Sequence, residues 1–359
     1  MEKLWSKTKI GNLELPHRLA MAPMTRSRAE EDGTPGELSS LYYAQRASMG
    51  LLITEGAQPS DDGQGYLRTP GIYTEKHIEG WKKVTDAVHE AGGYIYIQLM
   101  HVGRVSHPDN TPHHRQPVAP SAIAPGVETF TATGMQDIPV PRELSKEEIQ
   151  ITIADYRKAA AAAIEAGADG VEIHGANGYL INQFIGENSN KRTDEYGGSI
   201  ENRARFAIEV AKAIIDEIGA ERTGFRISPG TPLGGIQDGE QGPDLYRYLT
   251  QELAKLNLAY LHIMHLGNDE LLQDIRSLWT NPLLVNRAGR GLENIGVDIE
   301  SGLADLAPIG VWSLANPDFV ERLKAGAPLN EADPATFYGS GSKGYTDYPT
   351  LKELESQKG

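Results

Sequence analysis

The chain has 359 residues, of which 39% are hydrophobic, together with 39 glycines and 21 prolines. This composition is typical of a globular protein with many turns, and the length suits either two average domains or one large α/β barrel. There is no cysteine, which excludes disulfides, iron–sulfur clusters and thiol catalysis. The formal net charge of −15 argues against nucleic acid and anionic membranes as partners, because both require a basic surface.

Targeting segments are not visible in the sequence. The first 20 residues contain charges and lack the apolar core of a signal peptide. No run approaches the roughly 18 apolar residues that a membrane helix needs. We therefore expect a cytoplasmic protein.

Short apolar runs that end in polar or glycine-rich loops alternate with helical patterns from residue 18 onward. The runs predict strands at 19–24, 51–54, 94–99, 170–173, 223–227, 259–264, 283–286 and 306–310. The patterns between them predict helices at about 39–47, 75–91, 145–167, 199–218 and 244–256. Ser145 with Glu148 forms the pattern of a capping box, and Pro317 suits the first turn of the last helix.

The alternation of strands and helices indicates a parallel sheet. Eight such units in one chain fit a closed (β/α)8 barrel better than an open sheet. No G-x-G-x-x-G pattern follows a strand, so a Rossmann domain is not expected. We predict one α/β domain, a TIM barrel spanning 1–359, with an insertion rich in Pro, His and Thr at about 101–142 that covers the site.

A barrel of this kind places its chemistry at the carboxyl ends of its strands. The residues that follow each predicted strand are therefore candidates for a ligand site, and most of them form hydrogen bonds. They are Pro23, Met24, Thr25, Arg26, Glu55, Gly56, Gln98, His101, His174, Asn177, Arg226, His262, His265, Asn286, Arg287 and Gly310.

Polar side chains gather after the strand at 170–173, where His174, Asn177 and Tyr179 lie within six residues. The simpler explanation of the first two is that they satisfy the backbone of a turn. Alternatively, two converging donors bind a carbonyl or nitro oxygen and stabilise charge there, and Tyr179 then suits a general acid. An irregular polar segment is expected after them, up to Gly198, followed by a helix that Ser199 caps.

Arg226 is an unusual charge because it lies within an apolar strand. A buried arginine must be paired or must meet an anion. One hypothesis is an ion pair with Glu55 or Glu172, and the other is a cation held against an electron-rich ring, whose negative charge it would stabilise. No metal site is expected, because the sequence has no metal-binding pattern and the adjacent His113 and His114 point apart.

Longer motifs carry a family resemblance. The segment His174-Gly-Ala-Asn-Gly-Tyr-Leu-Ile-Asn-Gln-Phe and the segment 189–203 closely resemble the signature of the old yellow enzyme family of flavin-dependent ene reductases. Further matches lie at 21–28, 53–56, 64–66, 98–104, 224–229, 314–318, 336–339 and 344–349. The resemblance covers nearly the whole chain. It is greatest to the bacterial branch that includes N-ethylmaleimide and pentaerythritol tetranitrate reductases, partly because of Thr25.

The resemblance implies an FMN lying across the barrel mouth, with NADPH or NADH as electron donor. Arg226 would lie beside N1 and O2 of the flavin ring and favour its anionic reduced form. The other residues implied in FMN binding are Pro23, Met24 and Thr25 along the ring, Gly56 and Gln98 at its polar edge, and Gly289, Arg290, Gly310 and Val311 around the phosphate.

The resemblance also implies how a substrate reacts. His174 and Asn177 would hold its activating oxygen, with Tyr66 beside it. NAD(P)H would reduce FMN and leave; an activated alkene would then take hydride at its β-carbon and a proton from Tyr179 at its α-carbon. We therefore expect reduction of α,β-unsaturated carbonyl compounds, and of nitro compounds or nitrate esters, by a monomer or homodimer.

Two positions depart from the family pattern. Gly310 is followed by Val311, where much of the family has an arginine that clasps the FMN phosphate. We expect Arg287 or Arg290, with backbone amides, to take its place. Met100 stands where relatives often carry a bulky aromatic residue, which predicts a different and roomier substrate pocket.

Two other functions remain open from the sequence. One is a barrel lyase or isomerase that uses the phosphate loop for a phosphorylated substrate, although no lysine at a strand end and no metal cluster support it. The other is a protein that binds flavin or a phenol without turnover.

Overall fold

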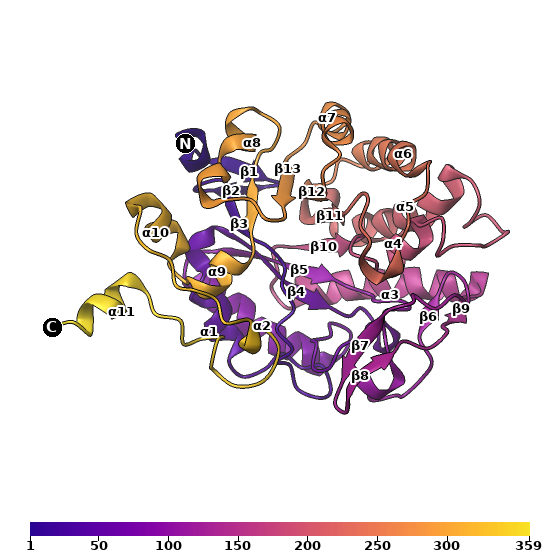
Figure 1. Cartoon of the computed structure of the whole chain (residues 1–359), viewed down its shortest axis with the longest axis horizontal. Coiled ribbons are helices and arrows are strands. Elements are labelled where there is room, and N and C mark those ends of the chain that lie inside the picture. Colours follow the sequence, from indigo (N-terminus) through magenta and orange to yellow (C-terminus); the bar gives the residue numbers. More distant parts are fainter.

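A parallel barrel forms the centre of the molecule (Figure 1). The computed structural model describes all 359 residues. Its eight central strands are β3 (Leu19–Met21), β4 (Leu51–Ala57), β5 (Tyr94–Leu99), β10 (Gly170–His174), β11 (Thr223–Ile227), β12 (Tyr260–His265), β13 (Leu283–Arg287) and β14 (Ala307–Ile309). Their hydrogen-bonded order is β13-β12-β11-β10-β5-β4-β3-β14, and a bridge between Leu284 and Leu306 joins the two ends of that order. The predicted TIM barrel is confirmed.

Helices surround this ring. The longer ones are α2 (Glu75–Glu90), α3 (Lys146–Glu165), α5 (Ile200–Ile218), α6 (Gly242–Ala254), α7 (Asp269–Leu278) and α10 (Phe319–Ala325). The short ones are α1 (Ser39–Ala44), α4 (Leu180–Ile185), α8 (Val297–Glu300), α9 (Val311–Ala315) and α11 (Leu351–Ser356). The predicted capping box of Ser145 and Glu148 begins α3, and Ser199 caps α5 as expected.

Two strands, β5 and β11, have the predicted bounds, whereas β3 and β4 differ most. β3 ends at Met21 rather than at residue 24, since Pro23 has no N–H with which to continue the ladder. β4 continues to Ala57 instead of ending at residue 54, with a shift in its register against β5 between Ile53 and Gly56. The carboxyl end of β4 therefore brings Gly56 beside β5.

The predicted irregular segment after Tyr179 is wrong at its start, because α4 occupies Leu180–Ile185 and all of its residues are buried. Its polar side chains bond to buried backbone. The Gln183 amide donates to the carbonyls of Val102 and Gly178, each at 2.9 Å. A helix of this kind looks polar in the sequence although it is part of the core.

The predicted start of the last barrel helix is also wrong. α10 begins at Phe319, so Pro317 lies before the helix rather than in its first turn. The side chain of Asn316 accepts a hydrogen bond from the backbone N–H of Asn330 at 2.7 Å, and the backbone of Asn316 is extended. This contact across the chain holds the segment before α10 out of the helix.

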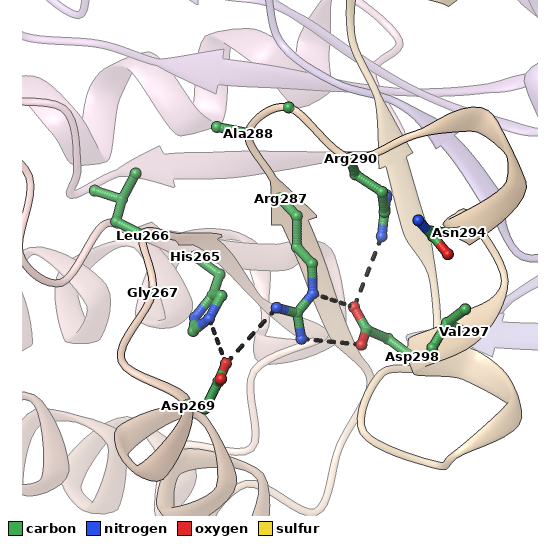
Figure 2. A pocket seen from close by; sticks show the side chains of 11 residues that line it. His265, Leu266, Gly267, Asp269, Arg287, Ala288, Arg290, Asn294, Val297 and Asp298 are labelled. Carbon is green, nitrogen blue, oxygen red and sulfur yellow. Dashed lines mark hydrogen bonds and ion pairs between the residues drawn. The ribbon is translucent and has the colours of Figure 1, made fainter.

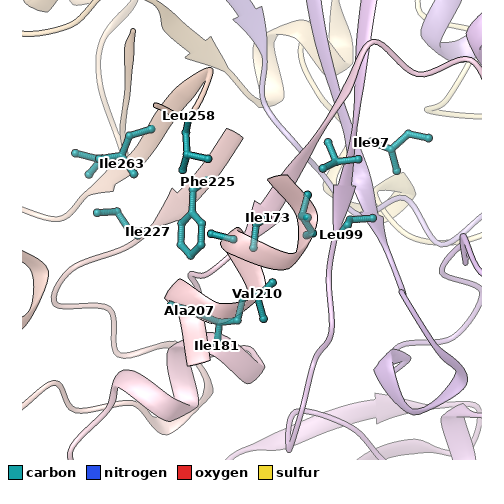
Figure 3. Close-up of a cluster of buried hydrophobic side chains, with 14 of the residues drawn as sticks. Ile97, Leu99, Ile173, Ile181, Ala207, Val210, Phe225, Ile227, Leu258 and Ile263 are labelled. Carbon is teal, nitrogen blue, oxygen red and sulfur yellow. The ribbon is translucent and has the colours of Figure 1, made fainter. Parts of the chain in front are cut away.

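Apolar side chains fill the space between the strands and the helices. A cluster of 64 buried residues lies there. Figure 3 shows the part of it in which Ile173 and Phe225 of the barrel meet Ile181, Ala207 and Val210 of α4 and α5. This packing holds the helices against the outside of the barrel.

A second cluster of 10 buried residues, which includes Tyr96, Tyr260 and Leu284, packs with the hairpin of β1 (Thr8–Ile10) and β2 (Leu13–Leu15). Several of its members open their strands, as Tyr260 opens β12 and Leu51 opens β4. The barrel is therefore filled toward its amino-terminal end, which leaves its carboxyl-terminal mouth for a ligand.

The insertion after β5 carries four short strands. β6 (Val118–Ala119) and β9 (Arg142–Glu143) pair in parallel, and β7 (Glu128–Thr131) and β8 (Gly134–Asp137) form an antiparallel hairpin. Phe130 and Met135 are partners across this hairpin. No helix of the chain is both long and apolar enough to cross a membrane.

Glycine is required at position 224 because the ring of Tyr260 crosses over it from the neighbouring strand. A Cβ at this position would lie 2.2 Å from the Tyr260 ring, which is completely buried. We expect Gly224→Ala to destabilise the fold by about 1–3 kcal/mol through overpacking, measured as a lower midpoint of thermal unfolding. Gly296→Ala is the matched control, because a Cβ there meets only the flexible side chain of Met1. Equal midpoints for the two variants would contradict the prediction.

Candidate active site

Three polar side chains stand side by side at the carboxyl ends of neighbouring strands. His174 of β10, Arg226 of β11 and His262 of β12 are paired in register. Glu172 lies two residues before His174 on β10, on the same face of the sheet. It is paired in register with Gln98 of β5. The strand ends thus bring together residues that are far apart in the sequence, as the prediction from barrel geometry required.

His174 is buried, with 2% of its surface exposed. Its Nδ1 accepts a hydrogen bond from the backbone N–H of Ala176 at 3.2 Å, so the neutral ring carries its proton on Nε2. Burial, and next the charge of Arg226, hold the pKa of His174 well below its usual range. The side chain is therefore a neutral donor. The hypothesis that His174 satisfies the backbone of a turn explains its Nδ1, but it leaves Nε2 available to a ligand.

Asn177 has a left-handed backbone with φ of 59°, a conformation that asparagine tolerates better than most residues. Its backbone N–H donates to Ser228 Oγ at 2.8 Å. Its side-chain Oδ1 is buried and has no partner in the protein. Rotation of the amide presents either oxygen or NH₂ at this point, so Asn177 can meet a ligand with a donor.

Tyr179 lies with its ring edge-on to His174, at 5.0 Å between centroids. Its hydroxyl is 2.8 Å from the hydroxyl of Tyr66, and the two share a hydrogen bond. Burial, together with Tyr66, raises the pKa of Tyr179 well above its usual range. The phenol therefore keeps its proton at neutral pH and is held where it can give that proton away.

Arg226 is 4% exposed, and its guanidinium donates no hydrogen bond to the protein. The hypothesis of an ion pair is wrong for both candidate acids. Glu55 accepts from the Tyr43 hydroxyl at 2.6 Å, Glu172 accepts from other groups, and neither lies within ion-pair distance of Arg226. A buried cation with all its donors free requires an acceptor from outside the chain.

The residues predicted to border the flavin ring lie at the carboxyl ends of other barrel strands. Pro23, Met24 and Thr25 follow β3 and are partly exposed. Gln98 is 2% exposed and donates from its Nε2 to Glu172 at 2.9 Å.

Met100 belongs to the apolar cluster next to the two tyrosines. It is 3% exposed and belongs to a small cluster with Val102 and Val105, against which Tyr66 and Tyr179 pack. A Cβ on Gly56 would lie 2.6 Å from the Met100 sulfur. Met100 thus belongs to the apolar cluster that supports the tyrosines, and glycine at position 56 makes room for it.

A cavity of about 1040 Å³ opens above Tyr66 and Tyr179. Large apolar side chains outside the predicted site residues form its outer part, namely Phe130 and Met135 of the hairpin and Tyr338 of the C-terminal segment, and each is more than half exposed. The lining residues are Thr25, Ser27, Glu31, Tyr66, Leu67, Arg68, Glu128, Thr129, Phe130, Ala132, Met135, Tyr179, Tyr338, Gly339 and Ser340.

The C-terminal segment reaches this cavity because two arginines after β3 bind its backbone. The buried Arg26 donates to the carbonyls of Phe337 at 3.0 Å and Gly344 at 2.6 Å. Arg28 donates to the carbonyl of Thr336 at 2.8 Å. No local sequence pattern predicts this contact, because its partners are more than 300 residues apart.

A second cavity, of about 640 Å³, lies at the ends of β12 and β13 (Figure 2). Arg287 is committed to Asp298 through hydrogen bonds of 2.7 and 3.0 Å. Arg290 lies 3.7 Å from the same carboxylate without a hydrogen bond, although its side chain is only 7% exposed and its Nη1 is buried. Of the two predicted substitute cations, Arg290 is the one that makes no hydrogen bond within the protein.

The other residues predicted around the phosphate are open. A Cβ on Gly289 would meet nothing within 4 Å, and one on Gly310 would meet only the Met24 sulfur, at 3.9 Å. Val311 begins α9 and is 46% exposed. None of these three positions is filled by the protein.

Comparisons with known proteins agree with this geometry. Residues 3–330 match the model of the NADH:flavin oxidoreductase / NADH oxidase family. A Leishmania infantum protein named "Probable flavin mononucleotide-dependent alkene reductase" is 43% identical over 353 residues, which cover 95% of this chain and 96% of that protein. The 12-oxophytodienoate reductase 2 of Arabidopsis thaliana is 40% identical over 358 residues, or 96% of this chain and 94% of that protein.

Solved structures give the same result. Morphinone reductase in complex with tetrahydroNAD has a TM-score of 0.93 and 43% identity, with 97% of each chain covered. The old yellow enzyme homologue from Zymomonas mobilis has a TM-score of 0.93 and 38% identity. The match covers 97% of this chain and 100% of that chain.

The protonation of His174 can be tested directly. Because burial disfavours the imidazolium, the folded-state pKa is lowered and the ring is neutral at every pH above that value. We expect the NMR signals of the His174 ring to show the Nε2–H tautomer and no titration from about pH 8 down to about pH 5.5. His174→Gln identifies the signals by their loss. A titration midpoint above this lower limit would contradict the prediction.

Proposed function

Since this chain belongs to the NADH:flavin oxidoreductase / NADH oxidase family, the family of the old yellow enzymes, we propose that His174, Asn177 and Tyr179 carry its reaction on α,β-unsaturated carbonyl compounds. The protein is an FMN-dependent alkene reductase that uses NAD(P)H. The hypotheses of a barrel lyase and of a binding protein without turnover are wrong.

The residues present fit FMN. The unpaired guanidinium of Arg226 supplies donors for the N1 and O2 edge of a flavin ring, and Gln98 lies on the same face of the barrel. The partly exposed segment from Pro23 to Thr25 offers a border for the ring, and the cavity beside Arg290 offers room for a phosphate. When bound, FMN supplies the hydride that it has received from NAD(P)H.

His174 and Asn177 polarise the substrate. The Nε2–H of His174 and the amide of Asn177 are free to donate to one carbonyl oxygen. The backbone N–H of Ala176 occupies Nδ1 of His174, and Asn177 binds Ser228 Oγ through its backbone N–H and not through its side chain. Two hydrogen bonds to this oxygen draw electrons from the conjugated double bond and stabilise negative charge that develops on the oxygen. The β-carbon then accepts hydride more readily.

Tyr179 completes the addition by giving its proton to the α-carbon. Its raised pKa keeps it protonated until carbanion character develops there. The hydrogen bond with Tyr66 fixes the direction of the hydroxyl. The contact of Tyr179 with His174, at 5.0 Å between ring centroids, is the single observation that carries the proposal, since it places the oxygen-binding group and the acid at one ligand.

The shape of the site suggests its range of substrates. The insertion at 101–142 acts as a lid of one barrel domain, since its hairpin contributes Phe130 and Met135 to the cavity above Tyr179. These side chains favour activated alkenes with an apolar extension. Nitro compounds and nitrate esters also suit the oxygen-binding pair. A cytoplasmic location and a monomeric or dimeric state stay predictions.

Replacement of the acid should separate the two half-reactions. We expect Tyr179→Phe to slow the reduction of an enone at least about 100-fold, since a general acid contributes about that much or more, while NADPH reduces the bound FMN at the parent rate. Nitro compounds, which need no proton on carbon, should be less affected. Anaerobic stopped-flow absorbance measures each step.

Tyr73→Phe is the matched control, because Tyr73 is 38% exposed and lies outside both cavities. It should reduce the enone at the parent rate. An unchanged rate for Tyr179→Phe, with FMN still reduced normally, would show that the acid is another group.

Arg290 should hold the FMN phosphate in place of the arginine missing at Val311. We expect Arg290→Gln to weaken FMN binding at least about tenfold, because a hydrogen bond to a charged group contributes about 1.5–3 kcal/mol. Val311→Arg should strengthen binding. Quenching of FMN fluorescence by the apoprotein gives both dissociation constants.

Arg247→Gln is the control, because Arg247 pairs with Asp244 and Asp274 on the surface. It should bind FMN like the parent. If Arg290→Gln did the same and Val311→Arg brought no gain, the phosphate would be held by other groups.

A further inference from the structure

A buried carboxylate lies beneath the residues that are placed at the flavin edge. Glu172 is completely buried. Its Oε1 accepts from Gln98 Nε2 at 2.9 Å, and its Oε2 accepts from the Tyr260 hydroxyl at 2.7 Å and from His262 Nδ1 at 3.1 Å. The donors come from β5 and β12, on either side of β10 and β11. Glu172, Tyr260 and His262 have no task in the reaction proposed for Tyr179.

The network holds Glu172 as an anion. Burial by itself would raise the pKa of this carboxyl, but the contacts with His262, the charge of Arg226 and the Tyr260 hydroxyl outweigh burial and lower the pKa below its usual range. Burial lowers the pKa of His262, although the charge of Glu172 opposes this effect, and the hydrogen bond of its Nδ1 to Glu172 is the contact that holds the ring in place.

The backbone is shaped to complete the network. Tyr260 lies on β12, two strands away from Glu172 on β10, and its ring passes over β11 where Gly224 has no side chain. Gly224 is itself the register partner of Glu172 and of Tyr260. The arrangement therefore uses a buried glycine and a buried tyrosine to hold one carboxylate.

Glu172 acts on Arg226 without binding it. Burial lowers the pKa of Arg226, and among the groups that oppose this effect the charge of Glu172 acts most strongly, although no ion pair joins the two residues. Because the oxygens of Glu172 are taken by other donors, the guanidinium keeps every donor for the ligand. The two buried charges offset one another through space, and Glu172 also anchors Gln98 by direct contact.

We infer that Glu172 is a positioning residue that sets the reduction potential of the bound FMN, because its negative charge limits how strongly Arg226 stabilises the reduced, anionic ring. This inference rests on the proposed place of Arg226 beside the flavin. Removal of this negative charge leaves the positive potential of Arg226 at the ring unopposed in a low-dielectric site, so the reduced, anionic ring becomes more stable.

The test is the two-electron reduction potential of the holoenzyme, measured by equilibration with a reference dye. We expect Glu172→Gln to favour the reduced form at least tenfold, a positive shift of about 30 mV. An unchanged or more negative potential in Glu172→Gln, with FMN retained, would overturn the inference.

Two further variants keep the charge and separate it from a purely structural role. Tyr260→Phe removes one hydrogen bond to Glu172, and Glu172→Asp withdraws the carboxylate from its donors. Both should stay within about threefold of the parent equilibrium, a shift of about 14 mV or less. A tenfold change in the reduction equilibrium of either variant would overturn the inference. This test still applies if Glu172→Gln does not fold. Enone reduction by the parent is measured separately, so failure of the proposed reaction is a distinct result.

Discussion

The active site depends on one buried charge that the protein does not pair. Arg226 lies at the carboxyl end of a central strand with all its donors free, and burial of such a group is tolerated only if a ligand supplies the acceptor. Its neighbours follow from this charge. His174 and His262 flank it in register, and both have lowered pKa values, because burial and the nearby cation disfavour a second positive charge. The one close anion, Glu172, is kept out of contact by other donors.

The substrate side uses neutral groups in place of charges. The ring of His174 is held by the backbone N–H of Ala176, and the backbone of Asn177 is held by Ser228 Oγ, while the other ring nitrogen and the side-chain amide stay free. Little backbone ordering is therefore needed when a ligand binds. Tyr66 likewise holds the hydroxyl of Tyr179. Glycine at position 56 makes room for Met100, whose apolar cluster packs against both tyrosines.

The two cavities divide the ligands by chemistry. The larger one ends in Phe130, Met135 and Tyr338, which come from an inserted hairpin and from the end of the chain. The smaller one contains the charges of Arg287, Arg290 and Asp298. Since Asp298 binds Arg287 bidentately and Arg290 only at ion-pair distance, the acid keeps one arginine in place and leaves the donors of the other available to a phosphate.

The sequence by itself determined the barrel, the order of its strands and the family, because alternating periodicity and the motif from His174 to Phe184 are local features. It misplaced the ends of most strands, such as β3 and β4, because pairing with neighbouring strands sets those ends. It also identified Arg226 as a buried cation but not its partner, since pairing depends on which acids the closed ring brings near. Only the tertiary structure decided that Gln98, Tyr260 and His262 occupy Glu172. The same holds for α4, the start of α10 and the cavity walls, where contacts between distant segments outweigh local propensity.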